Sequence, residues 1–125
     1  MINASCGMIF LALSQAGLWI WLRRRVTGNN LPRNQYVGIR TPSTMRSDAA
    51  WQAGQEAGSR LLMWSLPLHG IAAILMIANI IVWPKTVSFV LLTAVIWFIL
   101  YLGWIIYATS RAGVAARAVP ESGLG

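Results

Sequence analysis

Charged residues are scarce in this 125-residue chain: they make up 10% of the composition, whereas soluble domains carry about 25%. Hydrophobic residues account for 57%, which is more apolar surface than a soluble chain of this length could hide. The balance excludes an ordinary soluble domain and favours an integral membrane protein.

Acidic residues, histidine and cysteine are scarcer still. The three acids, Asp48, Glu56 and Glu121, are too scattered to predict a metal cage. With a single histidine, no nucleophile–base pair for hydrolysis or group transfer is visible. We therefore expect neither enzyme activity nor a cofactor. Cys6 stands alone, which excludes an internal disulfide, and we expect it to be a small buried side chain.

What the sequence has in abundance is long apolar stretches. Residues 4–22, 61–83 and 86–110 are each long enough to cross a hydrocarbon core, which takes about 20 residues. The fold class is therefore all-α, a three-helix membrane bundle over residues 1–111 with a mobile tail over 112–125. Pro67 lacks an N–H and predicts a kink near residues 63–66. The turn between the second and third stretches makes them antiparallel neighbours.

Arginine gathers on one side of the predicted spans. The connection over residues 23–60 and the tail hold nine arginines, whereas the turn before the third span holds only Lys85. The positive-inside rule then places residues 23–60 and the C-terminus in the cytoplasm and the N-terminus outside. Nucleic acid is not expected as a partner, because no basic helix is interleaved with base-stacking aromatics. An aromatic belt near the span ends is predicted for Trp19, Trp21, Trp64, Trp83 and Tyr107.

The long connection carries most of the polar chemistry. Residues 36–42 are typical of extended chain, and residues 49–59 of a short amphipathic or interfacial helix, capped by Thr44 or Ser47. Small residues recur on that helix at three- and four-residue steps, which predicts close packing, with a solvated linker helix as the alternative. Trp51 is expected at the membrane interface. Arg40 and Asp48 either form an ion pair or are both solvated.

One run of residues in this connection resembles the SdpI family of small bacterial membrane proteins. The matching positions are Asn34, Gly38, Ile39, Arg40, Thr41, Pro42, Thr44, Asp48 and Trp51. The resemblance implies a partner-binding or structural motif at these residues. It also implies a role in immunity against a membrane-active toxin, or in signalling by holding a cytoplasmic partner protein at the membrane. The family's namesake is longer, with additional helices. Many members have histidine where this chain has Gln55, so a proton- or metal-linked role of that histidine does not carry over.

Polar residues also occur inside the apolar stretches. Gln15, His69 and Tyr101 lie at similar depths, about 10–14 Å from the arginine-rich ends at 1.5 Å per residue. We expect them to meet in the bundle interior, either as a functional cluster or as structural hydrogen bonds between helices. His69 bonding the carbonyl that Pro67 frees is a further structural alternative.

Two functions follow from these patterns. The first is an SdpI-like immunity or signalling protein whose partners are lipids and either another membrane protein or a cytoplasmic protein. The second is an accessory subunit of a larger membrane complex. A transporter or enzyme is disfavoured, because three helices offer few walls for alternating access.

Overall fold

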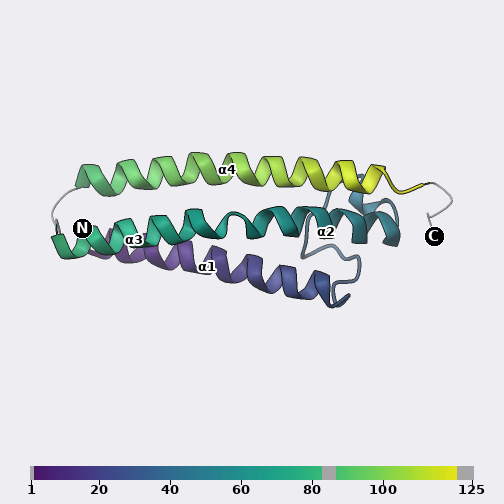
Figure 1. Cartoon of the computed structure of the whole chain (residues 1–125), viewed down its shortest axis with the longest axis horizontal. Coiled ribbons are helices and arrows are strands. Elements are labelled where there is room, and N and C mark those ends of the chain that lie inside the picture. The colour runs from purple at the N-terminus through teal and green to yellow at the C-terminus, as the bar shows by residue number, and fades with distance from the viewer. Residues whose placement is uncertain (1, 83–86, 121–125) are drawn as a thin grey trace.

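The computed structural model describes residues 2–82 and 87–120, which form a bundle of long helices (Figure 1). Helix α1 spans Ile2–Thr27, α2 Asp48–Met63, α3 Leu66–Val82 and α4 Val87–Arg117, and a short 3₁₀ helix, η1, spans Thr44–Arg46. No strand occurs within the described residues. The prediction of an all-helical bundle is confirmed.

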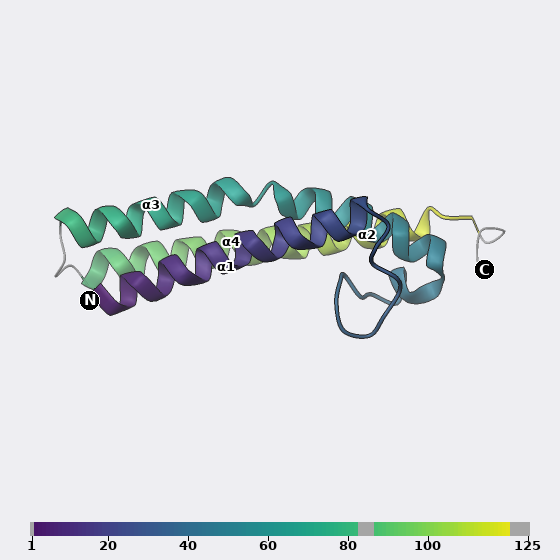
Figure 2. The same ribbon diagram turned by 90° about the horizontal axis from the view of Figure 1, so that it is seen from below.

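Helices α2 and α3 form one long rod that runs antiparallel to both α1 and α4 (Figures 1 and 2). Three helical stretches are long and apolar enough to cross a membrane: Ala4–Thr27, Asp48–Val82 and Val87–Arg117. Large apolar side chains along α3 and α4 are exposed, as expected for surfaces that face lipid. Cys6 is exposed too, which corrects its predicted burial.

The rod breaks at Trp64–Ser65, within the region where Pro67 predicted a kink. Proline has no N–H to donate to the carbonyl four residues earlier, so the series of backbone hydrogen bonds of the helix is interrupted there. Side chains take up carbonyls next to the break: Ser65 Oγ donates to Leu62 at 2.6 Å, and Trp104 Nε1 donates to Leu61 at 2.7 Å. Within a membrane such substitutes make an interrupted helix tolerable.

Two helices are longer than predicted. Helix α1 continues through Arg23–Arg25, because positive charge is favourable near a helix C-terminus. It ends at Thr27, two residues before Asn29, which adopts a left-handed conformation with φ of 53°. Helix α4 continues to Arg117, with Ala112 and Ala116 fully buried, so residues 112–117 are packed helix rather than the predicted mobile tail. The remaining tail positions 121–125, and Trp83 of the predicted aromatic belt, lie outside the described residues.

Candidate functional site

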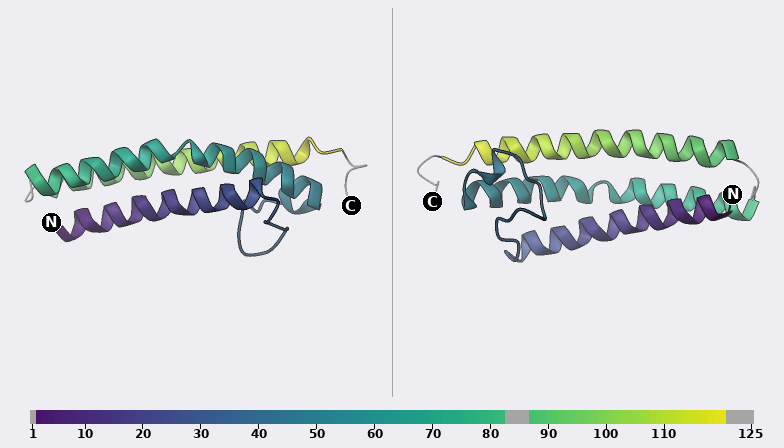
Figure 3. Two further views of the ribbon diagram at one scale, coloured as in Figure 1. Left: turned by 60° about the horizontal axis from the view of Figure 1, so that its bottom comes forward. Right: turned by 180° about the vertical axis from the view of Figure 1, so that it is seen from behind.

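The connection between α1 and α2 folds back onto the end of the bundle (Figure 3). We call residues 34–44 of this connection the motif segment. Asn34 organises its start: the side-chain Oδ1 accepts hydrogen bonds from the backbone N–H groups of Tyr36 and Val37, each at 2.8 Å, and Nδ2 donates to the Pro32 carbonyl at 2.8 Å. This is local turn chemistry that asparagine favours, and it fixes the direction in which the segment leaves the turn.

Gln55 of α2 clamps the middle of the motif segment. Its Oε1 accepts from the Ile39 N–H at 2.8 Å, and its Nε2 donates to the Ile39 carbonyl at 2.7 Å. The side-chain amide thus pairs with one backbone residue as a neighbouring β-strand would. Gln55 is fully buried, so both bonds are shielded from competing water.

Thr44 supplies a second anchor. Its hydroxyl donates to the Ile39 carbonyl at 2.9 Å and accepts from the Thr41 N–H at 2.8 Å, while Thr41 Oγ1 accepts from the Thr44 N–H at 3.2 Å. Pro42 lies between the two threonines, is exposed, and fixes the chain direction just before η1. The two threonines therefore close a compact turn whose polar groups satisfy each other.

The small face predicted for α2 receives this turn. A Cβ added to Gly54 would lie 2.4 Å from Thr44 Cγ2, and one added to Gly58 would lie 2.0 Å from Ile39 Cδ1 and 3.1 Å from Ala112 Cβ of α4. Ala50 is also fully buried. The packed interpretation of this face, rather than a solvated linker helix, is confirmed. Ser47 is the N-cap, its side chain accepting from the Ala50 N–H at 3.0 Å.

Trp51 is fully buried, which corrects its predicted place at a membrane interface. Its indole N–H donates to the Leu31 carbonyl at 2.8 Å, and it belongs to one buried hydrophobic cluster with Leu22, Val26 and Ile39. The tryptophan therefore forms the core beneath the motif segment and ties α1, the connection and α2 together.

Of the two alternatives for Arg40 and Asp48, the ion pair between them does not form. Asp48 instead meets Arg33, with Nε 3.2 Å from Oδ1, and Arg33 also donates to the Met45 carbonyl at 2.9 Å. Arg40 is exposed and bonds only locally, to the Gln35 carbonyl. Asp48 stays in the first turn of α2, as predicted, while Arg40 keeps a guanidinium at the surface without an ion pair among the described residues.

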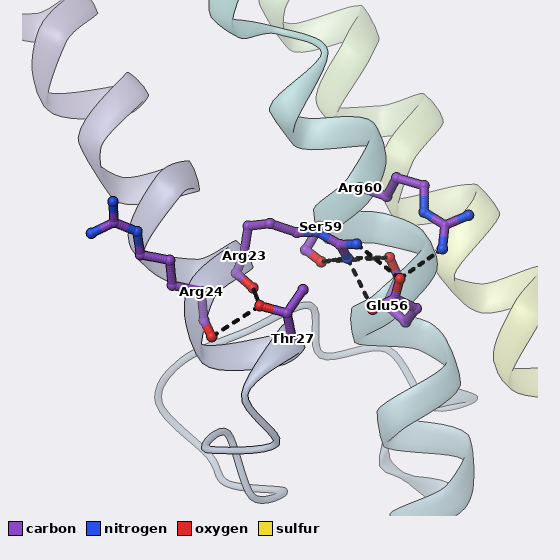
Figure 4. Close-up of polar contacts among 6 residues, drawn as sticks. All are labelled: Arg23, Arg24, Thr27, Glu56, Ser59 and Arg60. Carbon is purple, nitrogen blue, oxygen red and sulfur yellow. Dashed lines mark hydrogen bonds and ion pairs between the residues drawn. The ribbon is translucent and has the colours of Figure 1, made fainter.

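A second polar cluster joins α1 to α2 (Figure 4). Arg23 Nη1 lies 2.9 Å from Glu56 Oε2 and donates to Ser59 Oγ at 3.1 Å, while Arg60 Nη2 lies 2.7 Å from Glu56 Oε1. The Arg60–Glu56 spacing of four residues was visible in the sequence; the bridge from Arg23 depends on tertiary packing and was missed. Arg24 points away from this cluster.

Acid should loosen the link between α1 and α2. The Arg23 hydrogen bond holds the pKa of the Glu56 carboxyl below its usual range, although burial opposes this. A lowered folded-state pKa stabilises the protein above the unfolded-state pKa, and that contribution is lost as pH falls through the folded-state pKa. Because the carboxylate is 41% exposed, we expect a loss of less than about 1 kcal/mol. Unfolding in detergent from pH 7 to pH 3 measures it, and a Glu56→Gln variant should lack this component.

The end of α4 is tied to the same region. Arg46 Nη2 donates to the carbonyls of Ala116 at 2.8 Å and Val119 at 3.1 Å, while Arg117 donates to Ser43 Oγ at 3.3 Å. Carbonyls at a helix C-terminus have no partner within the helix, so an arginine satisfies them well. This capping explains why the helix persists beyond residue 111.

An open groove of about 510 Å³ lies where the motif segment meets the helices. Tyr36–Arg40 of the motif segment line it, together with Leu62 of α2. The other lining residues are Leu18, Trp19, Trp21 and Leu22 of α1 and Ile105 and Thr109 of α4. Its size falls in the range of roughly 300–1,000 Å³ typical of small-ligand sites. No pattern in the sequence indicated this groove, because its lining residues are far apart in the chain.

Gln15, His69 and Tyr101 come together between the helices, in the arrangement expected from their depths. The Tyr101 hydroxyl donates to Gln15 Oε1 at 2.6 Å and accepts from Trp19 Nε1 at 2.7 Å. The His69 ring meets the Tyr101 ring edge-on, with centroids 4.6 Å apart. Nearer the other end of the bundle, Ser5 Oγ donates to Asn79 Oδ1 at 3.1 Å.

His69 is held in one tautomer by its neighbours. Trp97 Nε1, which can only donate, bonds His69 Nδ1 at 3.1 Å. Nε2 therefore carries the proton and donates to Ser65 Oγ at 3.3 Å. The Ser65 hydroxyl in turn donates to the Leu62 carbonyl. No buried side-chain polar atom of the described residues lacks a hydrogen-bond partner. These closed hydrogen bonds support the structural interpretation of the cluster, and His69 bonds Ser65 rather than the carbonyl that Pro67 frees.

Removing the Tyr101 hydroxyl should destabilise the bundle. A Tyr101→Phe substitution leaves the Trp19 N–H and Gln15 Oε1 without their shared partner. The expected cost is about 1–2 kcal/mol, since two bonds are lost and each bond between membrane helices contributes about 0.6 kcal/mol on average. Thermal unfolding in detergent measures the loss. Tyr107→Phe, on the exposed side of the same helix, is the control. Equal stability of the two variants would contradict the hydrogen-bonding role.

The fold and the site define an integral membrane helical bundle whose arginine-rich end is built around one clamped polar segment. A family model for the SdpI/YfhL protein family matches residues 30–108, which include the motif segment, α2, α3 and most of α4. The chain belongs to this family. No curated protein and no solved structure matches it. Among the described residues, no three His, Cys, Asp or Glu side chains gather as metal ligands; Glu121 lies outside that part of the chain.

Proposed function

We propose that this chain is a membrane immunity protein that protects a bacterial cell from a membrane-active peptide toxin. The observation that carries the proposal is the way the family-matched segment is presented. Gln55 and Thr44 hold the motif segment in place by hydrogen bonds, while Tyr36, 86% exposed, and Arg40 line the groove. Rigid support under exposed aromatic and arginine side chains suits binding, since those residue types dominate recognition surfaces. The proposed role is one of binding, without chemistry on a substrate.

Survival of toxin-treated cells tests the proposal. The chain is expressed in a sensitive bacterium, which is exposed to the secreted peptide that the family's namesake counteracts. We expect expression to raise survival by at least about tenfold and Tyr36→Ala to abolish most of the gain, because truncating a central aromatic contact commonly costs more than 2 kcal/mol of binding. Tyr107→Ala, at equal membrane abundance, is the control. Survival that does not change with expression of the intact chain would refute the proposal.

The proposal includes a topology. The positive-inside rule supports a cytoplasmic motif segment, because nine arginines lie at that end of the bundle. A Gln35→Cys substitution in a Cys6→Ser background places one thiol in the exposed connection. An impermeant maleimide should label it after lysis and leave it unlabelled in intact cells. Labelling in intact cells would reverse the orientation. A cytoplasmic segment would also allow the signalling role, in which a soluble partner protein is held at the membrane.

The accessory-subunit role is the second candidate, and one surface favours it. A groove of about 280 Å³ between α3 and α4 is lined mainly by apolar side chains, including Leu68, Ala72 and Ile96. Small residues beside larger ones let another helix approach closely in a membrane. Affinity purification in mild detergent separates the two candidates: an accessory subunit should carry a membrane partner in fixed stoichiometry, whereas the immunity protein should be recovered without one when toxin is absent.

A further inference from the structure

We propose that the groove at the arginine-rich end binds one anionic phospholipid, with an acyl chain between α1 and α4 and the phosphate at Arg40. This inference goes beyond the immunity role and does not depend on it. The groove combines mainly apolar lining residues with one cation. Leu18, Leu62 and Ile105 supply apolar walls from three different helices, and Arg40 of the motif segment also lines it.

The depth of the groove matches that of a lipid headgroup. Its lining on α1 ends at Leu22, directly before the apolar stretch gives way to Arg23–Arg25. Trp21, 40% exposed, lines the groove and carries the Arg25 guanidinium over its ring at 5.3 Å from the centroid. Tryptophan and arginine in this order mark the boundary between hydrocarbon and headgroups. A molecule that enters here sideways from the membrane meets apolar walls first and positive charge at its polar end.

Charge complementarity favours an anionic headgroup. Among the residues that the structure describes, no acidic one lines the groove. The two acids described at this end are engaged elsewhere, Asp48 with Arg33 and Glu56 with Arg23 and Arg60. Arg40 has no ion pair among the described residues, so its free N–H groups can form a bidentate pair with a phosphate. Basic pockets between membrane helices are a known way of binding anionic lipid headgroups.

Native mass spectrometry of the full-length protein in a neutral detergent tests the proposal. The probes are dioleoylphosphatidylglycerol, dioleoylphosphatidylcholine and inorganic phosphate, each titrated separately. We expect one phosphatidylglycerol to bind at least about tenfold more tightly than phosphatidylcholine, because both carry a phosphate but the choline cation cancels the headgroup charge and is repelled by the arginine-rich end. Inorganic phosphate alone should show no comparable binding, because it cannot fill the apolar walls. Equal retention of the two lipids, or displacement of the lipid by millimolar phosphate, would overturn the proposal.

Two matched pairs of variants separate the groove from the rest of the surface. Arg40→Gln should remove the preference for phosphatidylglycerol, whereas Arg24→Gln, which makes the same charge change on a side chain outside the groove, should retain it. Leu18→Trp should fill the groove and lower the occupancy of both lipids, whereas Leu13→Trp, on an exposed part of the same helix, should not. If each variant behaves like its control, the lipid lies elsewhere and the assignment of the groove is wrong.

Discussion

Replacing Gly38 by alanine should release the motif segment from α2. Gly38 has φ of +110°, which side-chain-bearing residues rarely adopt, and an added Cβ would lie 2.8 Å from both Gln55 Oε1 and Trp51 Cη2. Neither neighbour can retreat, since both are fully buried and hydrogen-bonded. Backbone strain of about 1–2 kcal/mol adds to an overpacking cost of about 1–3 kcal/mol. We expect a destabilisation of about 2–5 kcal/mol, measured by thermal unfolding in detergent.

The location of the structural change in Gly38→Ala is as informative as the loss of stability. Trp51 should move toward a more polar environment, which a red shift of the tryptophan emission would report, while the overall helix content changes little. Gly103→Ala is the matched control: it replaces a helical glycine of α4 that has nothing within 4 Å of the added Cβ. It should be neutral or slightly stabilising, because alanine favours helix over glycine. A Gly38→Ala protein as stable as Gly103→Ala would show that the left-handed turn is not required.

Replacing Gln55 by leucine should have an effect of similar size for a different reason. The substitution keeps an apolar side chain of comparable length but removes both bonds to Ile39. The Ile39 carbonyl still accepts a hydrogen bond from the Thr44 hydroxyl, whereas the Ile39 N–H is left buried with no described partner. An orphaned buried donor costs about 1–3 kcal/mol, and the second lost bond adds about 1 kcal/mol. The expected destabilisation is therefore about 2–4 kcal/mol in the same unfolding measurement.

Two further variants sharpen this result. Gln52→Leu, on the same helix, removes only a 3.5 Å contact with the Leu31 carbonyl and should cost much less. Gln55→Glu keeps an acceptor for the Ile39 N–H but can donate to the carbonyl only while it is protonated. Its stability should therefore fall as pH rises and the carboxyl ionises, opposite to the acid sensitivity expected from Glu56. A Gln55→Glu protein with the wild-type pH profile would contradict the clamp geometry.

The clamp also explains what a residue with both a donor and an acceptor does at position 55. The primary amide presents a donor and an acceptor side by side on one edge, which matches the N–H and C=O of the single residue Ile39. Gln55 was visible in the sequence as a departure from the family pattern, but its contact with Ile39, sixteen residues away, was not.

Local patterns predicted the features that depend on neighbouring residues. Pro67 located the break in the second span because a missing N–H acts within one helical turn. Ser47 was one of two candidate caps, with Thr44, and its place directly before an acidic first turn is the one that the structure uses. The glycines of α2 indicated a packed face, since only a close neighbour makes small residues useful there.

Local patterns could not predict which charged side chains form ion pairs or whether a single side chain is buried. Asp48 lies near both Arg33 and Arg40 in the chain, and the turn made by Asn34 decides which arginine reaches it. Trp51 was placed at an interface on hydropathy alone, but the connection folds over it and leaves it fully buried.

The sequence by itself determined the membrane class, the three spans, the small-residue face of α2 and the family, because hydropathy, charge asymmetry and residue spacing act locally along the chain. Only the tertiary structure decided that Gln55 clamps Ile39, that Arg23 joins Glu56, and that the motif segment closes a groove against α1 and α4. Each of these contacts joins residues separated by many turns of chain, and hydrogen-bond geometry selects among partners whose local sequence signals are alike.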